Sequence, residues 1–169
     1  TRRGVDALVT TEPGVVLAAL FADCLPILLA ARDGSAVAVA HAGWRGTAAR
    51  VAERVVEALL DCGASANGLR VALGPCIKPC CYEVSDELYE RFGSDFGSEA
   101  TGRTRAGRPA LDLAGANRLL LTRLGVEPAA IDVSPLCTAC RTDLFFSHRA
   151  EMGITGRIAA TIAIREDRG

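Results

Sequence analysis

The fold is decided by the stretch VVLAALFADCLPILLAARDGSAVAVAHAGWRG, which covers residues 15–46. It contains three short apolar segments, residues 15–21, 27–31 and 36–40, whose length and composition are typical of β-strands. The break Asp23-Cys24-Leu25-Pro26 predicts a sharp corner between the first two strands. The third segment has only small or β-branched side chains, so we expect a strand that is buried on both faces and delivers His41 at its carboxyl end.

The rest of the chain has the patterns of three helices, three strands and a long loop. The apolar residues of the first helix share one face, and the pair Cys62-Gly63 ends the helix. The residues on this face are Val51, Val55, Val56, Leu59 and Leu60. Ser85 is an N-cap for a helix through Phe92, and Asp112 is an N-cap for a helix that stops at Gly125. Strands are expected at residues 69–73, 131–133 and 157–164. Residues 93–109 are rich in Gly, Ser, Thr and Arg and predict an exposed, mobile loop.

Strands and helices alternate along the chain without a strict strand–helix–strand rhythm. This order favours an α+β (mixed α/β) fold, a layered sandwich with mixed β-sheets flanked by helices, over a doubly wound parallel sheet. A length of 169 residues suits one domain, so we assign residues 1–169 to a single domain. The chain begins with Thr1 rather than Met, and we therefore expect processing or truncation at its N-terminus.

Composition excludes several classes of protein. Half of the residues are apolar and 23% are charged, which argues against a disordered chain. The formal net charge is -1, so we expect no nucleic-acid partner and no anionic membrane surface as partner. The longest apolar run, residues 14–31, is interrupted by Asp23 and Pro26 and does not predict a membrane span. Seven cysteines form an odd set that includes the adjacent pair Cys80-Cys81, and no secretory marker is present, so a reducing cytoplasm is the favoured location.

Cys24 and His41 form the first candidate site. Each is expected at a strand end beside a Gly or Pro corner, and 17 positions separate them. A thiolate and an imidazole are preferred ligands of zinc and also suit copper. The same pair could act as a nucleophile and its base, since a nearby imidazole activates a thiol. Core packing of both side chains is the third interpretation.

Two further segments carry polar groups between small or aromatic residues. In His41-Ala42-Gly43-Trp44-Arg45-Gly46, Arg45 at a strand-to-helix turn would suit an anion, whereas a core Trp44 and an ion-paired surface Arg45 are the alternative. In Phe145-Phe146-Ser147-His148-Arg149, an aromatic anchor precedes two groups that could face a ligand.

The remaining cysteines allow a second metal site. Cys76, with Cys80 or Cys81, could join Cys137 and Cys140 around a structural zinc ion. The C-x-x-C spacing of the second pair fits such a site, but the C-x-x-x-C spacing of the first lies in a Pro-rich corner. Reduced, buried cysteines are therefore the favoured interpretation.

Five segments in order resemble the laccase-domain family, and the resemblance runs from about Val5 to Ile164. They are Ala22-Asp23-Cys24-Leu25-Pro26, His41-Ala42-Gly43-Trp44-Arg45-Gly46, Gly74-Pro75-Cys76-Ile77, Phe145-Phe146-Ser147-His148-Arg149 and Thr155-Gly156-Arg157. Members of this family were first described as polyphenol oxidases. They are now described as purine nucleoside phosphorylases and adenosine deaminases, with a peptidoglycan-editing role proposed for some of them.

The resemblance implies a zinc site with one Cys and two His ligands, of which Cys24 and His41 match two. The third family ligand lies in a Val-His-Gly strand that would precede Thr1, so we expect this chain to bind zinc weakly and to show little nucleoside activity. Ala150 departs from the family, which usually repeats the arginine there. A lost strand would also leave an unpaired sheet edge, so we expect the chain to be able to self-associate.

The resemblance further implies a zinc-dependent purine nucleoside phosphorylase or adenosine deaminase that takes a purine nucleoside and phosphate as small-molecule substrates. Arg45 and Arg149 would bind phosphate, Trp44 or the plane of an arginine would flank the base, and His148 would act as an acid or base. Three alternatives stay open: a copper-dependent polyphenol oxidase, a metal-free Cys-His hydrolase that edits peptidoglycan precursors, and a non-catalytic domain. The two histidines of the chain, His41 and His148, are few for a copper oxidase.

Overall fold

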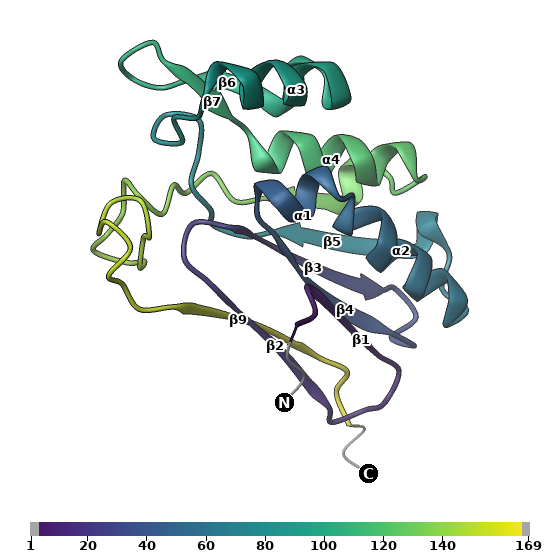
Figure 1. Cartoon of the computed structure of the whole chain (residues 1–169). Coiled ribbons are helices and arrows are strands. Elements are labelled where there is room, and N and C mark those ends of the chain that lie inside the picture. Colours follow the sequence, from purple (N-terminus) through teal and green to yellow (C-terminus); the bar gives the residue numbers. More distant parts are fainter. Residues whose placement is uncertain (1–3, 167–169) are drawn as a thin grey trace.

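A computed structural model describes residues 4–166 and contains one five-stranded sheet, two two-stranded sheets and four α-helices (Figure 1). The strands are β1 (Ala7–Thr10), β2 (Val16–Phe21), β3 (Leu25–Ala31), β4 (Val37–Ala42), β5 (Leu69–Leu73), β6 (Thr101–Arg103), β7 (Pro109–Leu111), β8 (Ile131–Val133) and β9 (Ile158–Ala163). The helices are α1 (Trp44–Ala48), α2 (Val51–Asp61), α3 (Asp86–Phe96) and α4 (Leu113–Arg123), and short 3-10 turns occur at η1 (Ala66–Gly68), η2 (Ser98–Ala100) and η3 (Pro128–Ala130).

The five-stranded sheet has the order β1-β4-β3-β5-β8. Its pairs β1–β4, β4–β3 and β3–β5 are antiparallel, whereas β5 and β8 are parallel. Strands β2 and β9 form a separate antiparallel pair, and so do β6 and β7. The structure thus confirms a mixed α/β fold with a mixed sheet.

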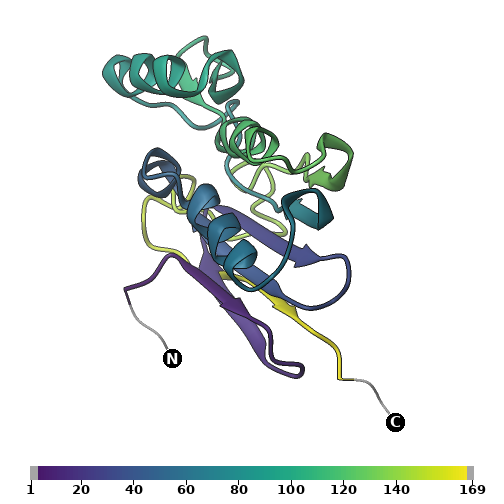
Figure 2. The same cartoon turned by 90° about the vertical axis from the view of Figure 1, so that its right-hand side faces the viewer.

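The central strand β4 separates two apolar layers. Ala38 and Ala40 face the helices and belong to the larger core cluster, whereas Val37 and Val39 face the β2–β9 pair. This alternation follows from the two-residue period of a strand. Figures 1 and 2 show α1, α2 and α4 on one side of the sheet and the β2–β9 pair on the other. The prediction of a strand buried on both faces is confirmed.

Several expected elements are confirmed close to their predicted bounds. Helix α2 begins at Val51, and strands β5, β8 and β9 match the expected segments. The Ser85 hydroxyl accepts a hydrogen bond from the backbone N–H of Leu88 at 3.3 Å, and Asp112 accepts one from that of Gly115 at 2.9 Å, so both predicted N-caps are present. Strand β1 and the short helix α1 were not predicted.

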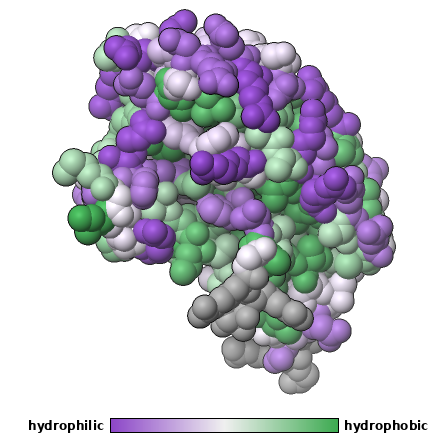
Figure 3. Space-filling view, in the orientation of Figure 1, coloured by the Kyte–Doolittle hydropathy of each residue, from purple (hydrophilic) through white to green (hydrophobic). Residues whose placement is uncertain are grey.

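The prediction of an exposed loop over residues 93–109 was wrong. Helix α3 continues to Phe96, and the segment then forms η2 and the β6–β7 hairpin. Phe92 and Phe96 are one helical turn apart and fully buried, with ring centroids 5.2 Å apart. Burial of these two rings outweighs the loop-like composition, and the helix ends only at Gly97, whose φ is 81°. The outer side of α3 is polar and exposed, as Figure 3 shows at the top of the molecule.

We predict opposite effects of alanine at two helical glycines. A Cβ at Gly115 of α4 would lie 1.8 Å from the backbone oxygen of Glu99, so α4 and η2 would have to separate. Gly115→Ala should lower the free energy of unfolding by about 1–3 kcal/mol or more, as overpacking does. At Gly93 of α3 the nearest atom would be Thr101 Cγ2 at 3.8 Å, an ordinary contact. Gly93→Ala should therefore raise stability by up to about 1 kcal/mol through helix propensity.

Denaturant unfolding of both variants beside the unchanged chain measures these effects. A Gly115→Ala variant that is as stable as the unchanged chain would contradict the close approach of α4 to η2.

Candidate functional site

The β3–β4 pair brings Cys24 and His41 to the same end of the central sheet. Pro26 and Leu25 are the register partners of His41 and Ala42, so Cys24 comes just before the paired strands and Gly43 just after them. A Cβ at Gly43 would lie 2.8 Å from Cys24 Sγ. The thiol therefore lies against the backbone that follows His41, and a larger residue in place of Gly43 would displace it.

A pocket of about 580 Å³ opens at this corner, a size suited to a small-molecule ligand. All six residues singled out from the sequence line it: Cys24, His41, Trp44, Arg45, His148 and Arg149. Residues that sequence reasoning did not assign to the site also line it, among them Asp6, Asp23, Tyr82 and Arg157. The pocket thus combines residues from the first, middle and last thirds of the chain.

His41, which lines the pocket, is held by two neighbouring residues. Its Nδ1 lies 3.6 Å from the Asp6 carboxylate, and its ring meets the Phe21 ring edge-on with centroids 5.2 Å apart. The backbone N–H of His41 also donates to the Asp6 carbonyl at 2.7 Å. A carboxylate beside one imidazole nitrogen is a common way to orient a histidine whose other nitrogen binds a metal.

Helix α1 carries Trp44 and Arg45 to the pocket. The Arg45 guanidinium lies 4.4 Å from the centre of the Trp44 ring, so the two side chains stack as a cation–π pair. The helix is fixed from behind, because Asn117 of α4 donates to the buried Thr47 hydroxyl at 2.9 Å. Trp44 also packs against the core, while Arg45 is exposed. Since α1 has only five residues, an anion here would depend on the guanidinium groups.

Asp23 joins the Cys24 corner to the loop that carries His148 and Arg149. One carboxylate oxygen accepts a hydrogen bond from the Thr138 hydroxyl and the other accepts one from the backbone N–H of Arg149, both at 2.6 Å. Asp23 is only 7% exposed and has a φ of 80°. A carboxylate is buried at acceptable cost only when its oxygens are hydrogen-bonded, so these contacts hold the loop in place.

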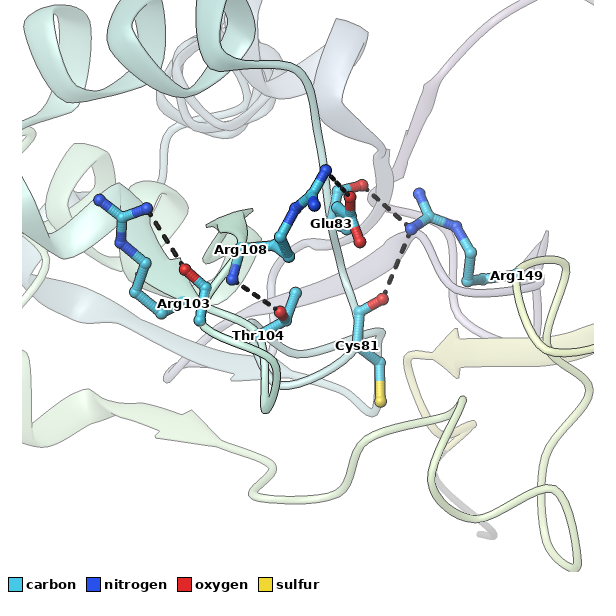
Figure 4. Close-up of polar contacts among 7 residues, drawn as sticks. Cys81, Glu83, Arg103, Thr104, Arg108 and Arg149 are labelled. Atoms are coloured by element: carbon cyan, nitrogen blue, oxygen red, sulfur yellow. Dashed lines mark hydrogen bonds and ion pairs between the residues drawn. The ribbon is translucent and has the colours of Figure 1, made fainter.

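The Arg149 side chain lies between this pocket and a neighbouring one. Its Nη1 donates to the carbonyl of Glu83 at 3.0 Å and to that of Cys81 at 3.5 Å (Figure 4). Its guanidinium also lies 5.3 Å from the centre of the Tyr82 ring. Burial is the main cause that raises the pKa of Tyr82 to about 12, so its phenol stays neutral at neutral pH. Arg149 is thereby oriented by the backbone of residues 81–83.

The Cys24 thiol is protonated at neutral pH when no metal is bound. Burial is the main cause that raises its pKa, and the negative charges of Asp23 and Asp6 add to the effect, whereas Arg157 opposes it. An activated thiol nucleophile needs a lowered pKa. This environment therefore disfavours a metal-free nucleophile at Cys24.

Two places in the described part of the chain offer metal ligands. Cys24 and His41 supply one thiol and one imidazole at the pocket, but among residues 4–166 they belong to no set of three or more His, Cys, Asp or Glu whose ligand atoms all lie within 4.8 Å of one another. Four thiols do meet outside the pocket: those of Cys80, Cys81, Cys137 and Cys140. The sequence-based hypothesis of Cys76 with one of the adjacent pair was wrong about Cys76, which is fully buried among apolar side chains.

Sequence signals existed for the site residues that were missed. Asp23 lies in the predicted corner next to Cys24, Tyr82 follows the Cys80-Cys81 pair, and Arg157 closes the segment Thr155-Gly156-Arg157. None of these signals shows which distant residues each side chain contacts. Asp6 has no such signal, because it precedes a strand that the sequence did not predict.

Comparison with known proteins places these features in a family. Residues 1–165 match the family described as "Multi-copper polyphenol oxidoreductase laccase". The chain is 45% identical over 168 residues to "Purine nucleoside phosphorylase YlmD" of Geobacillus stearothermophilus, an alignment that covers 97% of this chain and 61% of that protein. It is 41% identical to "Adenosine deaminase RL5" of an unknown prokaryotic organism, over 86% of this chain and 57% of that protein.

A solved structure has the same fold. The crystal structure of YlmD from Geobacillus stearothermophilus superposes with a TM-score of 0.88 at 44% identity, covering 96% of this chain and 62% of that one. The fold and the pocket thus define a mixed α/β domain of laccase-like type. The chain belongs to the family of laccase-like multi-copper polyphenol oxidoreductases, and it spans about three fifths of the length of these two relatives.

The described helices are all too short or too polar to cross a membrane.

We predict that the Asp23 carboxylate stabilises the His148–Arg149 loop. Asp23→Gly removes both acceptors but tolerates the positive φ, and it should lower the free energy of unfolding by about 1–3 kcal/mol, the cost of leaving buried donors unpaired. The Arg149 amide should also exchange its hydrogen faster. Asp23→Asn is the matched control, because its amide can bond both partners once the Thr138 hydroxyl turns. If Asp23→Gly keeps both the stability and the Arg149 protection, this role is wrong.

We predict that Cys24 ionises at higher pH than an ordinary thiol. In chelator-treated protein, the rate of Cys24 carbamidomethylation should still rise above a pH of about 8.5, where a free thiol is half ionised, because burial and two carboxylates disfavour the thiolate. Peptide mass spectrometry gives the pH profile, with N-acetylcysteine amide as the reference. The position of the profile, rather than the absolute rate, separates ionisation from restricted access. A midpoint below that of the reference would favour the metal-free hydrolase.

Proposed function

We propose that this chain forms the catalytic pocket of a purine nucleoside phosphorylase with a zinc ion at Cys24 and His41. One observation carries the proposal: a thiol, two imidazole rings, three guanidinium groups and an indole ring all line one pocket of a size suited to a nucleoside. The printed name of the Geobacillus relative supports this choice of reaction. Because the chain spans about three fifths of that protein, the activity of the complete enzyme is part of the proposal.

The proposed reaction converts a purine nucleoside and phosphate into a free purine base and a pentose 1-phosphate. A phosphate oxygen forms a bond to C1′ of the sugar as the bond from C1′ to the base nitrogen breaks. The electron pair of that bond leaves with the base, which gains a proton. Arg45 and Arg149 bind the phosphate, since guanidinium groups match its oxygens in pairs. Trp44 flanks the base, and His148 holds the proton that the base receives.

Cys24 and His41 suit zinc in donor type, because thiolate and imidazole are its common ligands. Asp6 beside His41 Nδ1 adds the outer partner that such a histidine usually has, and leaves Nε2 as the ligand atom. When bound, zinc supplies a Lewis acid at this end of the pocket. A catalytic zinc ordinarily has three protein ligands, so the two donors of the described chain predict weak binding.

Adenosine deamination is the second candidate, and the name of the second relative favours it. In this reaction water and adenosine give inosine and ammonia, so no phosphate is consumed. The same pocket would hold the nucleoside with C6 of the base, rather than C1′ of the sugar, next to Cys24 and His41. Dependence of turnover on phosphate distinguishes the two reactions.

The other two enzyme hypotheses fit the site less well. A copper-dependent polyphenol oxidase would draw on His41 and His148 alone as imidazole ligands from this chain. A metal-free hydrolase that edits peptidoglycan precursors would need an activated thiol, whereas burial raises the pKa of Cys24.

We also propose a setting for this activity. All seven cysteines are free, which suits a reducing compartment such as the cytoplasm.

Residues 1–169 act as one domain. Self-association of the chain would proceed through a sheet edge that lacks a neighbouring strand.

We predict that the phosphorylase reaction depends on the pocket residues named here. In the complete enzyme, with inosine and phosphate as substrates, Cys24→Ala should lower kcat/KM at least about 100-fold, because the metal site loses one of its ligands. Arg45→Ala should raise the KM for phosphate about 10-fold or more, because a charged hydrogen bond is worth about 1.5–3 kcal/mol. Release of base and pentose phosphate is followed by chromatography, with and without phosphate. Cys62→Ser, at an exposed thiol, is the control.

Two outcomes would contradict this proposal. Unchanged turnover by Cys24→Ala would mean that Cys24 is not part of the catalytic centre. Equal turnover of adenosine without phosphate, with ammonia released, would replace phosphorolysis with deamination.

A further inference from the structure

Four thiols meet outside the pocket, on two loops that leave neighbouring strands. Cys80 and Cys81 follow β5, whereas Cys137 and Cys140 follow β8. Because β5 and β8 are parallel, the loops that follow them leave the sheet at the same end, where both strands have their carboxyl ends. An isolated parallel bridge between Cys76 and Cys137 continues this pairing beyond the strands. Two segments about 60 residues apart in sequence are thereby placed side by side.

We propose that these four cysteines form a structural zinc site, separate from the pocket. All four sulfur atoms lie within 4.8 Å of one another. The Cys80–Cys140 sulfur distance is 3.7 Å and the Cys81–Cys140 distance is 3.4 Å. A tetrahedral zinc ion with Zn–S bonds of about 2.3 Å sets its sulfur ligands about 3.8 Å apart. The thiols are thus arranged as zinc requires, and small adjustments of their rotamers would complete the tetrahedron.

Donors around the cluster are placed to stabilise thiolates. Arg105 Nη2 lies 3.1 Å from Cys140 Sγ, and the backbone N–H of Lys78 donates to Cys137 Sγ at 3.4 Å. A zinc ion with four thiolates carries a net charge of -2, which a guanidinium group and backbone amides partly offset. Hydrogen bonds to the ligating atoms are the usual outer support of a metal site.

A disulfide explains the positions of the four sulfur atoms less completely than a zinc ion does. A Cys81–Cys140 bond would use only two of the four sulfur atoms and would leave Cys80 and Cys137 without a role. A closed set of four sulfur ligands is instead typical of structural zinc.

The zinc site would hold the wall of the pocket. Residues 81–83 contain Tyr82 and the two carbonyl groups that bind Arg149, and Thr138 lies between the two cysteines of the second loop and donates to Asp23. Linking the two loops through a metal ion therefore fixes Tyr82, Asp23 and Arg149 relative to one another. This inference does not depend on which reaction the pocket catalyses.

The test measures the zinc content of a chain in which the two candidate metal ligands of the pocket, Cys24 and His41, have been replaced by alanine. Cys24→Ala/His41→Ala protein is produced under reducing conditions with zinc in the medium, dialysed against metal-free buffer, and measured by inductively coupled plasma mass spectrometry. We expect about one zinc per chain, retained in an added Cys62→Ser and lost in an added Cys81→Ser or Cys140→Ser. Cys140→His should retain the metal, because imidazole is also a zinc ligand. Replacement by Co²⁺ should give intense sulfur-to-metal charge-transfer absorption that weakens in Cys140→His.

Three outcomes would overturn the proposal: no metal on the Cys24→Ala/His41→Ala protein, iron in place of zinc, or a Cys81–Cys140 disulfide in the intact mass under the same conditions. The metal count on the parent protein decides the question even if the serine variants fail to fold. Its result is also independent of nucleoside turnover, because Cys24 and His41 are absent from every sample.

Discussion

The arrangement of the pocket depends on the hydrogen bonds that the buried carboxylate of Asp23 accepts. Asp23 accepts hydrogen bonds from Thr138 and from the backbone of Arg149, and its own carbonyl accepts one from the backbone of Ile77 at 2.9 Å. Segments from three parts of the chain therefore meet at the residue that precedes Cys24. Burial of a charge is costly without such partners, so the loops and the corner are stable only together.

The parallel pairing of β5 and β8 provides the second constraint. It sends two long loops from the same end of the sheet, and these loops carry the four-cysteine cluster and also residues that line the pocket. Arg149 connects the two, because it lines the pocket while it donates to the carbonyl groups of Cys81 and Glu83. A site built from loops needs this kind of support, since loops have few backbone hydrogen bonds of their own.

The pocket is lined by side chains of both charges. Arg45, Arg149 and Arg157 line it together with Asp6 and Asp23, of which Asp23 is already engaged by hydrogen bonds. Burial and the two carboxylates keep the Cys24 thiol protonated, so a cation must displace its proton before the sulfur can act as a ligand. The raised pKa of Cys24 thus disfavours a free thiolate nucleophile, and it makes any metal binding at this thiol depend on pH.

Local pattern in the sequence predicted much of the sheet, α2 and the caps Ser85 and Asp112. Short motifs and the family resemblance, rather than periodicity, singled out six candidate site residues, and these lie among the residues that line the pocket. Those features depend on strand and helix periodicity, on cap chemistry and on motifs that lie within a few residues. Only the tertiary structure decided that residues 93–109 are ordered, that Cys80 and Cys81 rather than Cys76 join Cys137 and Cys140, and that Asp23 holds a loop more than 110 residues away. These features arise from burial of Phe96 and from contacts between distant segments, and no local pattern records which distant atoms a side chain will meet.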